Sequence, residues 1–257
     1  MFKKLLCLLF LLASCSLWAH QQSPVLANES YSRSKRLLLK EVYKDNKKTI
    51  YCQIPFDEAG HLIIPEGFDM SKVADRAHRI EIEHIIPAEK FGLYIKQWWK
   101  GDNLCVNKEG QPFKGRRCAE KTSRIFRLMQ ADMYNLYPTV GSLNAIRGHA
   151  DFGEFPKYFP SLYKSCLIKV ADGKIEIPDE AKGVVARTHL YFQEQYPFFK
   201  LTPEDQQLFQ KWNLLYPVSS WECLRTYRIE KIQLNENPFV KSQCIQNKLW
   251  PTEKEEK

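Results

Sequence analysis

The sequence predicts a helix-rich α+β fold in a single domain. Segments with amphipathic spacing or helix-capping residues cover much of the chain, whereas segments that predict strands are few and short. No internal repeat and no Gly/Ser-rich linker divides the chain, so its length suits one large domain better than two small ones. We therefore expect a domain over residues 20–247, preceded by a leader and followed by a charged tail at 248–257.

The first hundred residues predict two helices with a strand between them. Residues 31–48 place apolar side chains among lysines and arginines at helical spacing. Residues 49–54 are β-prone, and residues 55–78 are punctuated by proline and glycine, which is typical of a loop. The stretch RIEIEHIIP, residues 79–87, alternates isoleucine with charge, as a half-buried strand does. Residues 91–99 then predict a short helix that ends near Gly101.

The middle of the chain predicts a loop and two helical segments. Residues 101–117 contain three glycines and a proline, so they are expected to form a loop. A helix is expected from about Ser123 to about Leu136. Pro138 stands where a first helical position would suit it, which predicts a second helical segment over residues 139–147.

The last third predicts a hairpin followed by three helices. Residues 164–178 are expected to form two strands joined by a turn at Asp172-Gly173, a dipeptide favoured in tight hairpins. Asp179 resembles the N-cap of a helix that runs to about Gln195. Thr202-Pro203-Glu204-Asp205 opens a helix that continues through Leu215, and residues 220–232 predict a last helix before an irregular tail.

The N-terminus has the pattern of an export signal. Two lysines precede a short apolar run and then small residues, which predicts a signal peptide over residues 1–19. Leu12-Ala13-Ser14-Cys15 resembles a lipoprotein box, which would leave a lipid anchor on Cys15. Ordinary cleavage after Ala19 is the alternative, although it would put Leu17 at a position that prefers a small residue. Both alternatives place the protein in the periplasm or outside the cell, and no later segment is long and apolar enough to span a membrane.

Cysteine usage agrees with export. Of eight cysteines, six lie beyond the leader region, an even number that suits three disulfides in an oxidising compartment. Six cysteines allow fifteen pairings. Spacing favours the local pairs Cys105–Cys118 and Cys223–Cys244, which leaves Cys52–Cys166. No Cys-x-x-Cys motif occurs, so neither a zinc knuckle nor a thioredoxin-type redox site is indicated.

The charge favours a polyanionic partner without requiring one. The formal net charge of the full chain is +8. Basic residues cluster in one segment, which could bind a polyanion. The more usual interpretation of such a cluster is a solvated face of a helix. The cluster consists of Lys114, Arg116, Arg117, Lys121, Arg124 and Arg127.

Two polar sets could form a catalytic site. Glu83 and His84 end the patterned strand, and Asn144 and Arg147 share a helix face by their i, i+3 spacing. A carboxylate and an amide oxygen suit Mg2+, a neutral imidazole can take a proton from water, and arginines hold phosphate oxygens. Other motifs fail: Asp151-Phe152-Gly153 lacks the rest of a kinase pattern, and no His-Glu-x-x-His, Gly-x-Ser-x-Gly or P-loop is present.

Six blocks of the sequence together form a recognisable pattern: RIEIEHIIPAEKFG (79–92), GRRCAEK (115–121), ADMYNLYPTVGSLNAIRG (131–148), AKGVVARTHLYF (181–192), YPVSSWECLR (216–225) and NPFV (237–240). In these blocks the sequence resembles the bacterial endonuclease I family of exported non-specific nucleases. The resemblance implies a ββα-metal core in which His84 is the general base, Glu83 and Asn144 bind the metal, and Arg116 contacts the scissile phosphate. Arg117, next to Arg116, competes for that last role. Two departures from the family pattern, Ile82 in an aromatic position and Cys52 without a nearby cysteine partner, concern stability more than activity.

The expected function is therefore Mg2+-dependent, sequence-non-specific hydrolysis of DNA, and of RNA, by a monomer. Another divalent cation could replace Mg2+, and further contacts to nucleic acid are expected from Arg117, Arg147, Lys114, Lys121 and Arg124. Two alternatives remain. The protein could bind polyanions without catalysis, or it could be a zinc hydrolase that uses His78, Glu83 and His84, whose spacing matches no common zinc motif. Because adjacent strand residues point to opposite faces, we also expect the strand to end, bulge or twist at Glu83–His84.

Overall fold

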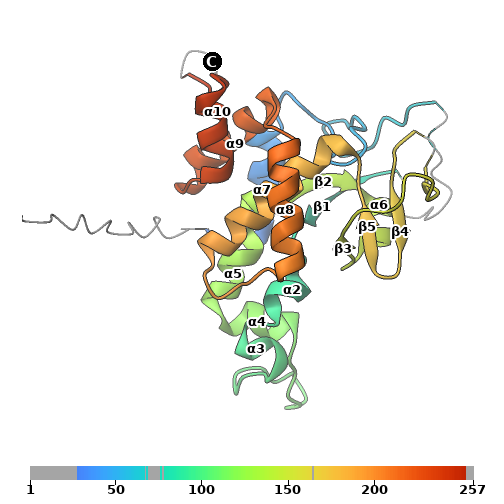
Figure 1. The fold of residues 1–257 in the computed structure, drawn as a ribbon. Helices are drawn as coiled ribbons and strands as arrows, with labels where there is room; N and C mark the ends of the chain where they lie inside the picture. The colour runs from blue at the N-terminus through green and yellow to red at the C-terminus, as the bar shows by residue number, and fades with distance from the viewer. Residues whose placement is uncertain (1–27, 67, 69–75, 77, 164, 253–257) are drawn as a thin grey trace, which may run out of the picture.

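The computed structural model describes residues 28–66, 68, 76, 78–163 and 165–252 (Figure 1). The expected signal peptide, the lipoprotein box with Cys15 and the last five residues of the charged tail lie outside these residues. The helical segments are α1 (Tyr31–Leu37), the π-helix η1 (Leu38–Val42), α2 (Ala88–Gly92), α3 (Lys96–Trp99), α4 (Arg116–Thr122), α5 (Arg124–Ala131), the 3-10 helix η3 (Met133–Asn135), α6 (Gly141–Arg147), α7 (Asp179–Gln195), α8 (Pro203–Leu215), α9 (Ser220–Gln233) and α10 (Pro238–Gln246). The strands are β1 (Ile80–His84), β2 (Leu136–Val140), β3 (Asp151–Phe152), β4 (Lys169–Ala171) and β5 (Lys174–Glu176).

In the part of the chain that the structure describes, two small sheets accompany the helices, which confirms the α+β prediction. β1 and β2 are antiparallel, and the register runs from Ile80 opposite Val140 to His84 opposite Leu136. The second sheet has the order β3-β5-β4, in which β5 is parallel to β3 and antiparallel to β4. In Figure 1 this second sheet lies to one side of the helices, whereas β1 and β2 lie close to their centre.

The long helix α7 contributes to two hydrophobic clusters. Tyr191 and Phe192 pack with residues of η1, α2, α5 and α9. Val185 and Leu190 pack with residues of β2, α6, the second sheet and α8. Most of α7 between Ala181 and Phe192 is buried, so this one helix packs against both clusters. The sheet of β1 and β2 is held between these two clusters.

β1 confirms the strand expected in RIEIEHIIP, and it ends at His84 without a bulge. The ladder stops because Asn135 replaces backbone pairing with side-chain bonds. Its Oδ1 accepts from the Ile86 N–H at 2.7 Å and its Nδ2 donates to the Ile86 carbonyl at 3.0 Å. The expected end of the strand is therefore present, and the register up to His84 contains no bulge.

Several N-terminal expectations were wrong in extent. The first helical segment ends at Val42 rather than near residue 48. Residues 49–54 form a turn instead of a strand, closed by a bond from the Thr49 N–H to the Ile54 carbonyl at 3.0 Å and by a positive φ of 52° at Gln53. The helix expected over residues 91–99 is two short helices, α2 and α3.

The prediction for residues 123–147 missed β2. The helix that begins after Ser123 ends at Ala131, because Asp132 takes an extended conformation and its side chain accepts from the Tyr134 N–H. Leu136 to Val140 then form a strand that includes Pro138. Proline lacks an N–H, but the Pro138 carbonyl still accepts from the Ile50 N–H at 2.9 Å, so it serves a strand position rather than a helix start.

The C-terminal predictions were largely confirmed. The hairpin turns at Asp172 and Gly173, both with positive φ, and α7 and α8 match their expected ranges. The cap of α7 is Pro178 rather than Asp179, and α10 follows α9, which is therefore not the last helix. All three disulfides favoured by spacing are present: Cys52–Cys166, Cys105–Cys118 and Cys223–Cys244.

Candidate active site

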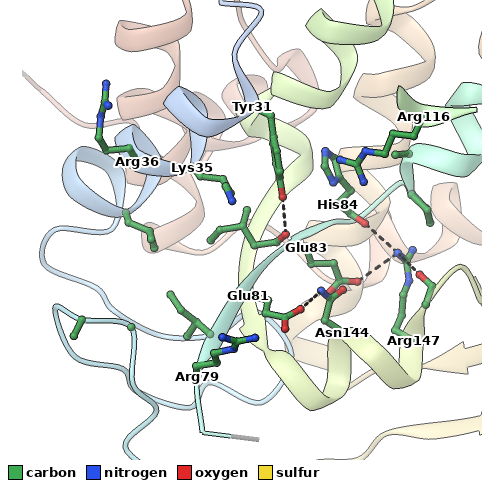
Figure 2. A pocket seen from close by; sticks show the side chains of 18 of the residues that line it. Tyr31, Lys35, Arg36, Arg79, Glu81, Glu83, His84, Arg116, Asn144 and Arg147 are labelled. Atoms are coloured by element: carbon green, nitrogen blue, oxygen red, sulfur yellow. Dashed lines mark hydrogen bonds and ion pairs between the residues drawn. The ribbon is translucent and has the colours of Figure 1, made fainter. Parts of the chain in front are cut away.

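The strongest site candidate is a cavity of about 710 Å3 that lies along β1, α1, α6 and the start of α4 (Figure 2). The residues that were expected to act together from separate parts of the sequence all line it. They are Glu83, His84, Arg116, Asn144 and Arg147. The fold therefore brings the two polar sets and one arginine of the basic segment to one place.

The two faces of β1 present different groups to this cavity. Glu81 and Glu83 share the face toward α6, where Asn144 Nδ2 donates to Glu81 at 2.7 Å and Arg147 lies 3.4 Å from Glu83. His84 belongs to the other face and contacts Tyr31 and Phe91. Among the described strands, β1 pairs with β2 alone, so groups from both faces of β1 can reach the cavity around the edge of β1 that faces away from β2. Adjacent residues can thus serve one site without a bulge.

Glu83 is a buried carboxylate with one uncommitted oxygen. Its Oε1 accepts from the Tyr51 hydroxyl at 2.7 Å, whereas its Oε2 has no hydrogen-bond partner among the described residues. Burial raises the pKa of Glu83, and the Arg147 guanidinium opposes that rise. A buried oxygen without a partner is costly unless a cation or water completes it, so this position fits a hard divalent cation held by Glu83 and the Asn144 amide oxygen.

His84 is held as a neutral base. Its Nε2 lies 2.9 Å from the carbonyl of Gln130, and since a carbonyl only accepts, Nε2 carries the proton and Nδ1 keeps its lone pair. Tyr31 stacks on the imidazole with ring centroids 5.0 Å apart. The pKa of His84 is lowered from 6.5 to about 4, chiefly by burial and to a smaller extent by the nearby Arg116, Arg147 and Lys35, whereas the hydrogen bond to Gln130 opposes the shift. The ring is therefore uncharged at neutral pH, and the Nδ1 lone pair is available.

Arg147 fixes the end of β1. It is buried, and its guanidinium donates to the carbonyls of His84, at 3.0 Å, and Ile85 while it pairs with Glu83. These bonds hold the backbone that carries both Glu83 and His84. Arg147 thus has fewer donors available for a phosphate than its position alone suggested.

Arg116 and Arg117 occupy different environments. Arg116 lines the cavity and is partly exposed, with weak contacts to Glu120 at 3.4 Å and to the Gln130 side chain at 3.5 Å. Arg117 does not line the cavity and lies over the ring of Phe113, 4.9 Å from its centroid. Of the two arginines, Arg116 is the one that lines the cavity, where it lies beside His84 (Figure 2).

The other basic residues expected to bind nucleic acid lie outside this cavity. Lys114 lines a second cavity formed by the loop after α3. Lys121 donates to the Leu104 carbonyl, and Arg124 pairs with Glu29 at 2.7 Å. They could contact a long substrate only beyond the immediate site.

Several residues of the cavity were not identified from the sequence. Tyr31, Lys35 and Arg36 come from α1, about fifty residues before β1, and no local pattern connects them to it. Arg79 and Glu81 flank Ile80. Glu81 did have a signal, since its spacing of two from Glu83 puts both carboxylates on one strand face.

The zinc alternative finds no support in the arrangement of side chains. Within the described residues, no three His, Cys, Asp or Glu side chains are grouped as metal ligands. Glu83 bonds to Tyr51 on one face of β1, whereas His84 bonds to Gln130 on the other.

In the part of the chain that the structure describes, no helix has both the length and the apolar composition of a membrane span.

Comparisons with known proteins agree on one family. The family model described as Endonuclease I matches residues 27–244. An extracellular deoxyribonuclease from Aeromonas hydrophila is 33% identical over 219 residues, 82% of this chain and 89% of that protein. A periplasmic deoxyribonuclease from the same organism is 32% identical over 230 residues, 86% of this chain and 90% of that protein. Endonuclease-1 from Buchnera aphidicola subsp. Baizongia pistaciae is 32% identical over 229 residues, 86% of each chain.

Proposed function

The chain belongs to the endonuclease I family of nucleases, and from this premise we propose that it is an exported, Mg2+-dependent endonuclease that hydrolyses DNA with His84 as general base. One observation carries the proposal. The uncommitted Glu83 oxygen, the Asn144 amide, the neutral His84 imidazole and Arg116 line the same cavity. Antiparallel β1 and β2 followed by α6 supply the two strands and the helix of a ββα-metal core, which supports that assignment.

The metal would be held by Glu83 and Asn144. Oxygen ligands and positions left open for water or phosphate are the preferred environment of Mg2+, although another divalent cation could occupy the same ligands. When bound, the cation polarises a phosphate oxygen and neutralises negative charge in the transition state. Tyr51 and Arg147 hold Glu83 Oε1, and Oε2, which has no hydrogen-bond partner among the described residues, would be the oxygen that binds the cation.

His84 performs the proton transfer. Nδ1 takes a proton from a water molecule while the water oxygen forms a new bond to phosphorus. The bond from phosphorus to the 3′ oxygen breaks, and the 3′ oxygen leaves with the electron pair and takes a proton from solvent. The products carry a 5′-phosphate and a 3′-hydroxyl, and the Arg116 guanidinium stabilises charge on the phosphate.

The substrate range follows from contacts to the backbone of nucleic acid. Lys35, Arg36 and Arg79 line the cavity together with Arg116, so basic side chains that can contact phosphates lie beside its glutamates. Phosphate contacts carry no sequence information, so cleavage should be non-specific and should extend to RNA. Binding should weaken steeply as salt rises.

The location and assembly are proposed on the same basis. Relatives named extracellular and periplasmic deoxyribonucleases support a periplasmic or secreted protein. We infer that residues 20–247 act as one monomeric nuclease domain and that residues 248–257 are a tail. The choice between a lipid anchor on Cys15 and cleavage after Ala19 can be read from the mass of the mature N-terminus.

Substitution of the two central residues tests the division of roles. His84→Ala should reduce the rate of plasmid nicking by about a hundredfold or more, because general-base catalysis is lost. Asn144→Ala should also reduce the rate, but raised Mg2+ should restore part of it, since a lost ligand weakens affinity. Nicking is measured on supercoiled plasmid over a range of Mg2+ concentrations.

Arg117→Ala is the matched control for Arg116→Ala, because the two arginines are adjacent but only Arg116 lines the cavity. Arg116→Ala should slow nicking much more than Arg117→Ala. Normal nicking by a folded His84→Ala variant, or equal rescue of His84→Ala and Asn144→Ala by Mg2+, would contradict the assigned roles.

A further inference from the structure

We propose that Glu81 is a positioning residue that orients the side-chain amide of Asn144, so that its oxygen faces the metal site. The proposal rests on the proposed function, since this orientation matters only if Asn144 binds a cation. It assigns a purpose to a second acidic side chain that lies beside the site without a role in the proton transfer.

The geometry places Glu81 directly against Asn144. Asn144 Nδ2 donates to Glu81 Oε2 at 2.7 Å, and both residues line the cavity. On its other side, Glu81 Oε1 accepts from Arg76 Nε at 2.7 Å. Figure 2 shows Glu81 and Glu83 on the strand opposite Asn144 and Arg147 of α6. Each carboxylate of β1 therefore has one partner on that helix.

An amide needs such a partner because its two ends have almost the same shape. A cation binds only to the amide oxygen. The side-chain amide of asparagine can rotate by a half-turn, however, and present its NH2 group to the cation instead. A carboxylate accepts hydrogen bonds and cannot donate them, so Glu81 fixes Nδ2 on its own side. The rotated amide would place Oδ1 against a carboxylate oxygen, and the two would repel. Oδ1 is thus directed away from Glu81 before any cation binds.

The alternative is that Glu81 is itself a metal ligand. The oxygens of Glu81 are already committed to Arg76 and Asn144, whereas Glu83 Oε2 has no partner among the described residues. The side chain of Glu81 is also 19% exposed, so it can be solvated without a cation, while Glu83 is 1% exposed. These contrasts assign Glu83 to the metal and Glu81 to the amide.

A double-mutant cycle separates the two roles. Glu81→Ala should weaken Mg2+ binding by about tenfold, the lower end for loss of a group that orients a metal ligand. Asn144→Asp replaces the amide with a carboxylate. Both terminal atoms of this side chain are then oxygens, so its orientation no longer matters. In the Asn144→Asp background, Glu81→Ala should cost nothing or should tighten binding, because it removes a like charge. Mg2+ affinity is measured by isothermal titration calorimetry on the full mature protein without nucleic acid.

Glu89→Ala is the matched control. Glu89 is a partly exposed glutamate of α2 that does not line the cavity, so its removal tests the loss of one negative charge alone, and affinity should change less than twofold. Thermal unfolding of each variant checks that the fold is kept. Equal weakening by Glu81→Ala in both backgrounds would make Glu81 a ligand or a structural residue and would overturn the proposal.

Absence of any weakening in either background would overturn it as well. Failure of the proposed function gives a different result, in which Mg2+ binding by the wild-type protein does not depend on Glu83. Dependence on Glu83 and Asn144 without dependence on Glu81 would refute only the positioning role.

Discussion

Glu83 and His84 show how two adjacent strand residues can line one cavity. Glu83 is held by Tyr51 and Arg147, whereas His84 is held by Gln130 and stacks on Tyr31. Their side chains leave β1 on opposite faces, and the cavity extends past the strand edge to include both. An irregular strand is therefore unnecessary, and the regular strand fixes the relative position of the proposed base and the proposed metal ligand.

Sequence reasoning at this scale found residues with local patterns and missed those with none. The pair Asn144 and Arg147 was identifiable because helix spacing alone puts them on one face. Tyr31 was not, because its contact with His84 depends on how α1 packs after the chain has folded. The commitment of Arg147 to backbone carbonyls was equally hidden, since a sequence gives charge but not burial.

His189 gives a prediction about stability and pH. It is buried, stacks on Phe209 with centroids 3.9 Å apart, and has its pKa lowered from 6.5 to about 3, chiefly by burial. The unfolded chain takes up a proton at this histidine near pH 6.5 and the folded chain does not, so the free energy of unfolding falls as pH falls below that value. His189→Gln should lessen the loss of unfolding free energy between pH 7 and pH 5 by roughly 2 kcal/mol. Urea unfolding at both pH values measures it, and an identical pH dependence in both proteins would contradict the prediction.

At the scale of elements, the missed strand β2 is the most instructive error. The segment Leu136–Val140 contains a proline and follows a helix, so local propensity favoured a helix start. Pairing with β1 and the Ile50 contact decide otherwise, and neither is visible in a short window of sequence. By contrast, α8 was predicted well because Thr202 caps it through a bond to the Asp205 N–H, which is a local interaction.

Gly141 controls how closely α6 approaches β1. Its N–H donates to the Arg79 carbonyl at 3.0 Å, and an added Cβ would lie 2.5 Å from the Arg76 carbonyl oxygen. Gly141→Ala should push the first turn of α6 away from β1 and displace Asn144 from Glu83. Nicking should fall at least tenfold, since misplacement of about 1 Å can cost a hundredfold in rate.

Gly153→Ala is the control for this substitution, because a Cβ there meets only the Lys174 side chain, at 3.4 Å or more. Its nicking rate should stay within about twofold of wild type. If Gly141→Ala nicks as fast as Gly153→Ala, close approach of α6 is not what positions Asn144.

At the scale of the whole molecule, covalent links and charge agree with an exported nuclease. The Cys52–Cys166 disulfide joins residues 114 apart, so it restricts the unfolded chain more than the local pairs do. The pairing of Cys52 with Cys166 could be predicted because the other four cysteines form two local disulfides, with sequence separations of 13 and 21, and these two cysteines remain. Folding that depends on disulfides would restrict activity to an oxidising compartment.

The claim that this protein cleaves nucleic acid, rather than only binding it, is tested most directly on supercoiled plasmid. The same preparation of wild-type protein is incubated with plasmid in Mg2+ and in EDTA, and both retention on DNA and conversion to nicked circles are measured. We predict nicking in Mg2+ and none in EDTA, with retention reduced by salt in both. Retention in both conditions without nicking in either would contradict the account and would identify a polyanion-binding protein instead.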